Sequence, residues 1–237
     1  MDRISSWNYK REANQKKKQK ALSMHRNYRY DIDGNMVYKT GMGQMIYNGK
    51  NQIVSVTNDS DFHYDANGNM LKGNDKVYRY NAFNKVSRLS YDSGYQTFAY
   101  DESNALVKKV INNNKTIYYV GTGYELELET TEEGINKTMR HNVMVEGKIV
   151  AVHTRTLEAG KKKADKTAYI HKDLLGSVDT VTENSGKIVY RNEFTPYGEN
   201  ISNLEGTKEF DKRDLRGFTG HRQIAEANII NSERKRE

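Results

Sequence analysis

Apolar and polar side chains alternate along most of the chain after residue 25, in short runs that glycine and asparagine interrupt. Lys76–Tyr80 and Val86–Tyr91 are two such runs, and Tyr124–Glu129 alternates without a break, with one acidic face and one apolar face. Alternation with a period of two is typical of half-buried β-strands. The pattern therefore predicts an all-β protein built from many short antiparallel strands.

A short motif recurs between these runs and divides the first half of the chain into units. Each unit reads Tyr, Asp or Asn, two variable residues, Gly or Asn, one variable residue and an apolar residue. The clearest copy is Tyr64-Asp65-Ala66-Asn67-Gly68-Asn69-Met70. The tyrosines that open the five copies are Tyr30, Tyr47, Tyr64, Tyr80 and Tyr100, spaced by 17, 17, 16 and 20 residues.

Each position of the motif has a structural role in a β-hairpin. The Tyr ring packs on the sheet, the Asp or Asn side chain caps the turn, and the Gly or Asn tolerates the positive φ of a tight turn. One hairpin alone is marginal, but stacked copies bury a shared strip and form a curved or spiralling sheet. The motif residues that carry these roles are Tyr30, Asp31, Gly34, Tyr64, Asp65, Gly68, Tyr80, Tyr100 and Asp101.

The second half keeps the β pattern without the strict repeat. Asn142–Val152 reads as a hairpin, and Thr167–His171, Val178–Thr182 and Lys187–Phe194 read as further strands. Between them, Glu158–Lys166 is expected to be a charged loop. Near the end of the chain, Ile224–Ile230 is compatible with a short helix.

Composition narrows the class of protein. Of 237 residues, 35% are hydrophobic and 17 are tyrosine, so the core is expected to be thin or distributed along the chain. The absence of Cys excludes disulfides and thiolate metal sites. No apolar run is long enough to span a bilayer, and the N-terminus lacks the apolar core of a signal peptide.

The net charge of +7 is concentrated at one end. Residues 1–24 hold seven Lys or Arg and two acids, a net charge of +5, which leaves +2 for all the other residues. The basic segment is predicted to be disordered or a short helix, with binding to an acidic partner as the alternative. Because the charge belongs to this tail, we do not expect the β-region to bind nucleic acid.

Candidate chemistry is sparse. The six histidines are scattered, and the two Asp-rich turns lack the bidentate Glu of a calcium loop, because Met42 and Lys76 stand at that position. Gly121-Thr122-Gly123 lacks the third glycine of a dinucleotide site. We therefore expect no catalytic residue, no cofactor and no metal, and the chain is not predicted to be an enzyme.

Four blocks in the second half, taken with the Tyr-Asp units, resemble a known family. The blocks are His171-Lys172-Asp173-Leu174-Leu175-Gly176-Ser177, Gly186-Lys187-Ile188-Val189-Tyr190, Phe194-Thr195-Pro196-Tyr197-Gly198-Glu199 and Phe218-Thr219-Gly220-His221. In this order they resemble the Rhs repeat-associated core domain of the Rhs/YD-repeat family, which includes bacterial Rhs polymorphic toxins and Tc-toxin C subunits. The motif positions that carry over as structural residues are His171, Asp173, Leu175, Gly176, Ser177, Pro196, Tyr197, Gly198 and Gly220.

The resemblance implies a β-shell that encloses a C-terminal toxin. The implied partners are the remainder of the shell, the toxin domain, and other shell or secretion components of a secreted or cell-surface bacterial protein. Arg222 stands where the family usually has an acid, and the self-cleavage segment and the toxin are missing, so a fragment or truncated product is expected. A surface- or carbohydrate-binding β-repeat protein is the alternative.

The sequence thus predicts four regions. They are a basic tail over residues 1–24, YD repeats over 25–120, a core-like β-region over 121–221 and a divergent tail over 222–237.

Overall fold

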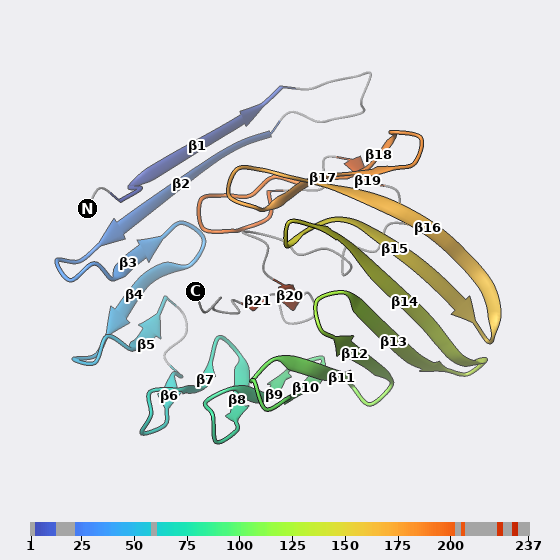
Figure 1. Cartoon of the computed structure of the whole chain (residues 1–237). Helices are drawn as coiled ribbons and strands as arrows, with labels where there is room; N and C mark the ends of the chain where they lie inside the picture. Colours follow the sequence, from blue (N-terminus) through green and yellow to red (C-terminus); the bar gives the residue numbers. More distant parts are fainter. Residues whose placement is uncertain are drawn as a thin grey trace. The chain divides into compact units, whose positions relative to one another are not determined.

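A computed structural model describes residues 3–12, 22–57 and 61–201, together with the backbone of three short strands between residues 205 and 231. All the regular elements in these ranges are β-strands, and every strand pairing is antiparallel (Figure 1). The predicted all-β, antiparallel architecture is therefore confirmed. Met1–Tyr95 and Gln96–Glu237 form two compact units.

The first unit contains nine strands that follow one another in sequence order. Five of them form one sheet, in the order β1-β2-β3-β4-β5, and β6 to β9 follow as successive neighbours. The bounds are β1 Ser6–Arg11, β2 Leu22–Tyr30, β3 Met36–Lys39, β4 Gly43–Tyr47, β5 Ile53–Val56, β6 His63–Tyr64, β7 Met70–Gly73, β8 Lys76–Tyr80 and β9 Val86–Tyr91.

The prediction of a disordered or helical tail over residues 1–24 is wrong for the part of the tail that the structure describes. Ser6–Arg11 is a strand that pairs with β2, with Trp7 opposite Arg26 and Tyr9 opposite Met24. The cause is a period-two pattern, in which Trp7, Tyr9 and Arg11 face the more covered side and the polar residues between them face solvent. Residues 13–21 lie outside the described part of the chain.

The second unit also keeps sequence order, from β10 to β19. The bounds are β10 Gly94–Tyr100, β11 Leu106–Ile111, β12 Lys115–Val120, β13 Tyr124–Thr131, β14 Gly134–Val145, β15 Lys148–Glu158, β16 Lys161–Lys172, β17 Val178–Glu183, β18 Ile188–Arg191 and β19 Glu205–Gly206. Strands β14 to β16 are 11 or 12 residues long and form the curved part of the sheet in Figure 1.

The predicted charged loop over Glu158–Lys166 is wrong. Strand β15 continues to Glu158 and β16 begins at Lys161, so only Ala159 and Gly160 turn the chain. Both turn residues have positive φ, as a two-residue hairpin turn requires. The charges mislead because exposed Lys side chains reach water from a strand as readily as from a loop.

The short helix considered for Ile224–Ile230 is also contradicted. The backbone there forms β20 (Arg222–Ile224) and β21 (Ile229–Asn231), which pair with each other, Ile224 opposite Ile229. The segment is compatible with either state from sequence alone, because the β-branched Ile224, Ile229 and Ile230 favour strands while their spacing does not decide. The predicted division of the chain at residues 120 and 121 stays a prediction.

The core is divided into small clusters, as the low apolar content predicts. One cluster joins Met45, Val56 and Phe62 in the first unit. In the described part of the second unit, one cluster consists of Ile111, Ile117 and Tyr119, and another of Val178, Val181, Val189 and Tyr190. Because these three clusters are small, the hydrogen bonds of the turns add to the structural specificity.

Candidate functional site: stacked Asx turns

One turn geometry recurs along both units. The Asp or Asn that follows the motif Tyr donates its backbone N–H to the carbonyl of the residue four positions later. Its own backbone carbonyl accepts a hydrogen bond from the N–H of the residue three positions later. Its side-chain Oδ1 then accepts the N–H four residues on, as between Asp65 and Asn69 at 2.8 Å and between Asp101 and Ala105 at 2.9 Å. This is an Asx turn, in which a side chain completes the backbone hydrogen bonding.

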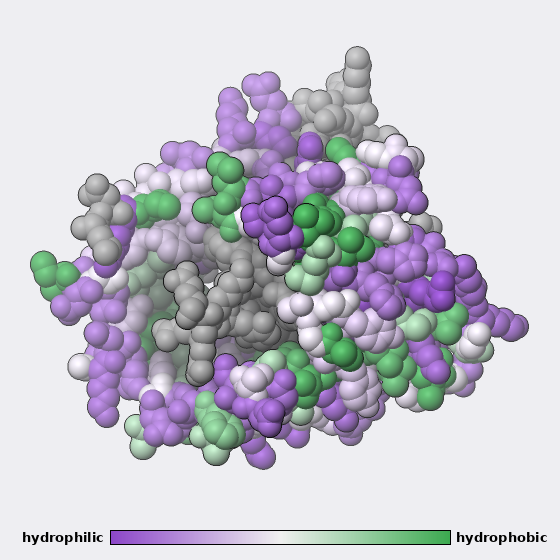
Figure 2. Space-filling model, in the orientation of Figure 1, coloured by the Kyte–Doolittle hydropathy of each residue, from purple (hydrophilic) through white to green (hydrophobic). Residues whose placement is uncertain are grey.

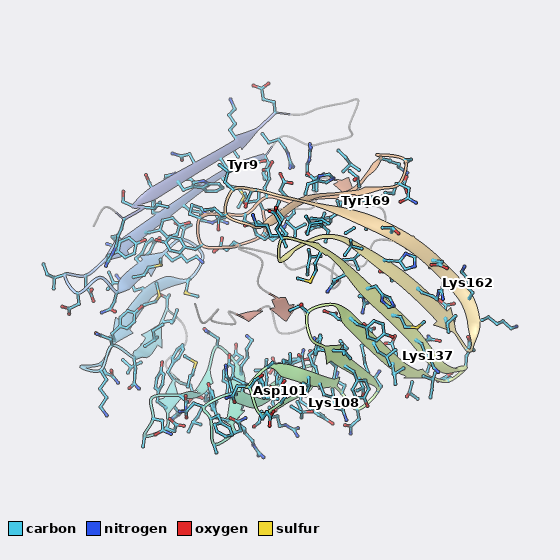
Figure 3. The ribbon with its side chains drawn as sticks, viewed as in Figure 1. Tyr9, Asp101, Lys108, Lys137, Lys162 and Tyr169 are labelled. Carbon is cyan, nitrogen blue, oxygen red and sulfur yellow. The ribbon has the colours of Figure 1, made fainter. Side chains whose placement is uncertain are left out.

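The same arrangement holds in each copy of the motif. Figure 3 shows Asp101 at its turn between β10 and β11. The residue four after the motif Tyr has positive φ in every copy. These residues are Gly34, Asn51, Gly68, Asn84 and Asn104, with φ of 92°, 57°, 82°, 56° and 63°. Gly and Asn are the residues that adopt this conformation with little strain, which explains their place in the repeat.

Tyrosine hydroxyls connect each motif hairpin to the hairpin before it in the sequence. Tyr47 donates to the Met36 carbonyl, Tyr64 to the Ile53 carbonyl and Tyr80 to the Met70 carbonyl, each at 2.9 Å. Burial raises the pKa of all three phenols. Tyr30 makes the equivalent bond to the Ile4 carbonyl at 3.1 Å. The hydroxyls thus fix the position of one hairpin against the preceding one.

Asn side chains make a second connection between neighbouring turns. Asn35 donates to the side-chain oxygen of Asn51 at 3.2 Å, and Asn69 donates to that of Asn84 at 2.8 Å. The variable position before the apolar residue, held by Asn35 and Asn69, therefore has a role that the sequence alone did not reveal: its amide bonds the Asn that takes the Gly position in the next copy. The clue in the sequence is the recurrence of Asn at both positions in alternate copies.

Removing one tyrosine hydroxyl tests this connection between successive hairpins. Tyr64→Phe is expected to lower the free energy of unfolding by about 1 kcal/mol, because the Ile53 carbonyl loses its side-chain donor. Urea denaturation measures the change. Tyr118→Phe is the control, because the Tyr118 ring is exposed, and it should leave the midpoint unaltered. Equal effects of the two substitutions would contradict the role of the Tyr64 hydroxyl.

The turn aspartates also predict a pH dependence. The pKa values of Asp31, Asp65 and Asp101 lie below the ordinary 3.8, chiefly through side-chain hydrogen bonds from Asn35, Asn69 and Ser103. A lowered folded-state pKa adds stability that is present above 3.8 and is lost as the pH falls through the folded value. The urea midpoint should therefore be constant near neutral pH and fall below about pH 4.

A triple variant tests this dependence. Asp31→Asn, Asp65→Asn and Asp101→Asn together should flatten the acid limb of the stability curve, because Asn keeps the Oδ1 acceptor but does not titrate. Asp33→Asn, in the same turn as Asp31, is the matched control. An acid limb that the triple variant leaves unaltered would show that other groups cause the acid sensitivity.

The structure brings the predicted residues of the second-half motif into the same turn geometry. Asp173 Oδ1 accepts the N–H of Leu175 at 2.9 Å and of Ser177 at 2.8 Å, and Gly176 has a φ of 84°. Ser177 is fully buried where β17 begins. His171 lies at the end of β16, with its Nε2 3.0 Å from Thr182 Oγ1 on β17.

The block around Pro196 is a further copy of this turn, which the sequence did not identify. Thr195 replaces the Asp, and its Oγ1 accepts the Glu199 N–H at 3.1 Å. The backbone bonds are the same, and Gly198 has a φ of 80°. Tyr197 lies at the exposed tip. In the sequence, the feature that could identify this turn is the Gly three residues after the capping residue. Gly220 lies outside the described residues.

A buried charge network was missed altogether. Lys115 on β12, Glu127 on β13 and Arg140 on β14 are only 8%, 5% and 4% exposed. Glu127 Oε1 is 3.1 Å from Lys115 Nζ, and its Oε2 is 3.1 Å from Arg140 Nη1. The acidic face of Tyr124–Glu129 is thus covered at its centre. Alternation within one strand gives no sign of this, because it does not say which face is buried.

On the face of the sheet opposite to the Glu127 network, one set of side chains has the connectivity of an acid–base relay. His153 Nδ1 lies 3.0 Å from Thr167 Oγ1, and its Nε2 lies 2.9 Å from Asp165 Oδ1. The hydrogen bond from Lys162, with Arg155 beside it, lowers the pKa of Asp165 to about 2. Asp165 is therefore shared among three cationic or ionisable groups.

We interpret this set as pairing across strands. His153 and Thr167 are direct partners in the register of β15 and β16. A His–Thr contact of the same length recurs between His171 on β16 and Thr182 on β17. The described residues also contain no cluster of three or more His, Asp or Glu side chains placed to hold a metal ion.

Comparisons with known proteins agree with this architecture. The family model described as Teneurin YD-shell matches residues 3–208. The tRNA3(Ser)-specific nuclease WapA of Bacillus spizizenii is 26% identical over 213 residues, which cover 85% of this chain and 9% of the nuclease. The toxin subunit YenC1 of Yersinia entomophaga is 24% identical, covering 73% of this chain and 21% of that subunit.

Solved structures show the same fold. The Tc holotoxin pore of Photorhabdus luminescens superposes with a TM-score of 0.74 at 17% identity, and the TcdB2-TccC3-Cdc42 complex with 0.76 at 16%. Each match covers 89% of this chain and 11% of the other. This chain therefore spans between about a tenth and a fifth of the length of the relatives that it matches.

Proposed function

This chain belongs to the Teneurin YD-shell family, and from that premise we propose that it is a wall segment of a Rhs/YD-repeat toxin-delivery protein. The segment contributes structure, while a C-terminal toxin domain is the cargo that the complete wall encloses. The observation that carries the proposal is the run of β10 to β18, which extends one antiparallel sheet strand by strand, with the Asx turn of the motif at residues 101–105 and again at 173–177.

The geometry supports a wall in a second respect. In the first unit the hydrogen bonds of the Tyr hydroxyls and Asn amides join each hairpin to the next, so the sheet can be extended without a closed core. Repeat proteins gain stability from contacts between neighbours in this way. We propose that the partners are the remaining wall and the cargo, and that the protein acts outside a bacterial cell. No helix in the described part of the chain is long and apolar enough to cross a membrane.

A structural role also fits the relation to the Bacillus spizizenii nuclease. It matches this chain over 9% of its own length, so most of the nuclease lies beyond the shared segment. We propose that the shared segment is wall and that this chain is not itself an enzyme. Sugar binding is less well supported, because the motif rings of Tyr47, Tyr64 and Tyr80 are partly buried and bonded to backbone.

A graft tests the proposal. This chain replaces the matched segment in a shell protein of the family, and trypsin digestion follows the fate of the enclosed C-terminal domain. The enclosed domain should stay protected from trypsin, and it should become accessible when Asp65, Asp101 and Asp173 are replaced by Ala in the graft. A graft that gives a β-type circular dichroism spectrum but leaves the domain open to trypsin would contradict a wall role.

A further inference from the structure

Strand β1 is the last strand of its five-stranded sheet, and its outer edge has no neighbour among the described strands (Figure 1). On the inner side, the Tyr28 N–H donates to the Ser5 carbonyl at 2.9 Å, which sets the alternation of hydrogen bonds between β1 and β2. Every second residue after Ser5 therefore turns its backbone groups toward β2, and the residues between turn theirs to the outer edge. The outward-facing residues are Ser6, Asn8 and Lys10.

A tyrosine hydroxyl shows which place β1 has in the repeat. We call the strand that ends in the motif Tyr the first strand of a hairpin, and the strand that follows the turn the second strand. In later copies the motif Tyr donates to the carbonyl of the apolar residue that begins the preceding second strand, as Tyr64 does to Ile53 at 2.9 Å. Tyr30 donates to Ile4 in the same way, at 3.1 Å. Ile4 thus has the position of that apolar residue, and β1 has the position of a second strand.

The contacts of Arg3 give the same assignment independently. In a later copy, the residue before the apolar one is Asn35, and it bonds Asn51, the residue at the Gly position of the next turn. Arg3 precedes the apolar position at β1, and its guanidinium fills the space that a Cβ on Gly34, the Gly of the next turn, would need. The same guanidinium lies 5.3 Å from the centre of the Tyr30 ring. Residues 3 and 4 therefore contact the following turn as the last two motif residues do elsewhere.

Each of the other second strands has its own first strand beside it. Strands β3, β5, β7, β9 and β11 pair with β2, β4, β6, β8 and β10. The edge of β1 is the equivalent surface, and a row of outward N–H and C=O groups is a template for one more strand. We propose that this edge binds an antiparallel first strand of a motif hairpin, supplied by the remaining wall. The inference rests on the proposed wall function and names the edge at which the wall joins this segment.

Charge favours a motif strand over the β1 edge of a second copy. Residues 3–11 include Arg3, Lys10 and Arg11 and no acid. Figure 2 shows hydrophilic atoms over the end of β1 that Arg11 forms, at the top of the view. Two β1 edges side by side would bring these cations together without a counter-charge. A first strand that ends in Tyr-Asp brings an acid instead.

The repeat also predicts the register of the bound strand. In the hairpin of β10 and β11, the motif Tyr lies opposite the apolar residue, and the residues one and three positions before the Tyr lie opposite those two and four positions after the apolar residue. The same register at β1 places the partner's motif Tyr opposite Ile4, and the other two residues opposite Ser6 and Asn8. Because Ser6 and Asn8 face the outer edge, each exchanges two backbone hydrogen bonds with the residue opposite.

Amide hydrogen exchange in the presence of a synthetic strand tests the proposal. The probe is a peptide of residues 94–101, a first strand with its motif Tyr and Asp, added to the unmodified chain. The peptide should slow exchange at the outward N–H groups of Ser6, Asn8 and Lys10. Exchange at Trp7 and Tyr9, whose N–H groups already face β2, should not change. No slowing at the outward-facing residues, or equal slowing in both sets, would overturn the proposal.

Methylation of the peptide nitrogens tests the register. Methyl groups on the nitrogens of Thr97 and Ala99, which face β1 in the predicted register, should weaken binding at least about tenfold, the effect of losing two backbone hydrogen bonds. Methyl groups on Gln96 and Phe98, which face away, are the matched control and should leave the affinity nearly unaltered. Fluorescence anisotropy of the labelled peptides measures both affinities. Equal weakening by the two pairs would contradict pairing at this edge.

Variants of the chain locate the bound peptide. Asn8→Pro removes one outward N–H at an edge position, where proline is tolerated, and should weaken binding of the unmethylated peptide at least about fivefold, the effect of losing one backbone hydrogen bond. Asn8→Ala keeps the N–H and is the matched control. A peptide of residues 4–11 that binds as tightly as the probe would assign the edge to a second copy and overturn the proposal. The trypsin assay of the grafted shell does not depend on this peptide, so the two proposals can fail separately.

Discussion

Glu127→Ala is expected to lower the free energy of unfolding by about 3–5 kcal/mol, the range for breaking a buried ion pair from one side. The substitution leaves Lys115 and Arg140 without the carboxylate that both contact at 3.1 Å. Both cations are more than nine-tenths buried, so water cannot replace the lost partner. Urea denaturation of the variant and the unmodified chain measures the difference.

Two further variants show whether charge is the cause. Glu129→Gln is the control, because Glu129 contacts Lys115 at 3.0 Å but its side chain is 36% exposed, so the loss should be below about 1 kcal/mol. Replacing the network by Lys115→Met, Glu127→Leu and Arg140→Met should recover most of the stability that Glu127→Ala removes. If the triple variant is as unstable as Glu127→Ala, unpaired buried charge is not the cause of the lost stability.

Val181→Asp is expected to unfold the sheet around β16 to β18. Val181 is fully buried and forms a cluster with Val178, Val189 and Tyr190, against which Ile170 packs. An unpaired carboxylate there costs several kcal/mol, and the cluster is too small for other contacts to compensate. Limited proteolysis should cut the variant between residues 161 and 191 at a protease concentration that spares the unmodified chain.

The adjacent residue supplies the control for this prediction. Thr180→Asp introduces the same charge on the other face of β17, where the Thr180 hydroxyl already accepts from Arg191 Nε at 3.4 Å. This variant should remain resistant to the protease. Equal sensitivity of the two variants would contradict the assignment of Val181 to the buried face.

The turns were the most predictable part of the fold. Asp65 and Gly68 each have one local role, so the order of residues is enough to infer the cap and the positive φ. The same holds for Asp173 and Gly176. The Thr195 turn escaped recognition because Thr, a weaker cap than Asp, occupies the capping position.

The features that depend on pairing could not be read from the sequence. The strand at Ser6–Arg11 is polar in composition, and its partner β2 is what makes it a strand. The charged segment Glu158–Lys166 is predicted as a loop because a sequence shows charge but not the neighbouring strand. Glu127 is buried because Lys115 and Arg140 come from two other strands to meet it. Each case needs a long-range register that local pattern does not contain.

The most direct test of the account is hydrogen exchange at the capped amides of the turns. The N–H groups of Asn69, Ala105 and Ser177 are bonded to the side chains of Asp65, Asp101 and Asp173 in a surface turn. A wall of stacked Asx turns predicts slow exchange at all three, and fast exchange at each one when its own Asp is replaced by Ala. Exchange at the rate of an unstructured peptide in the unmodified chain would contradict the account.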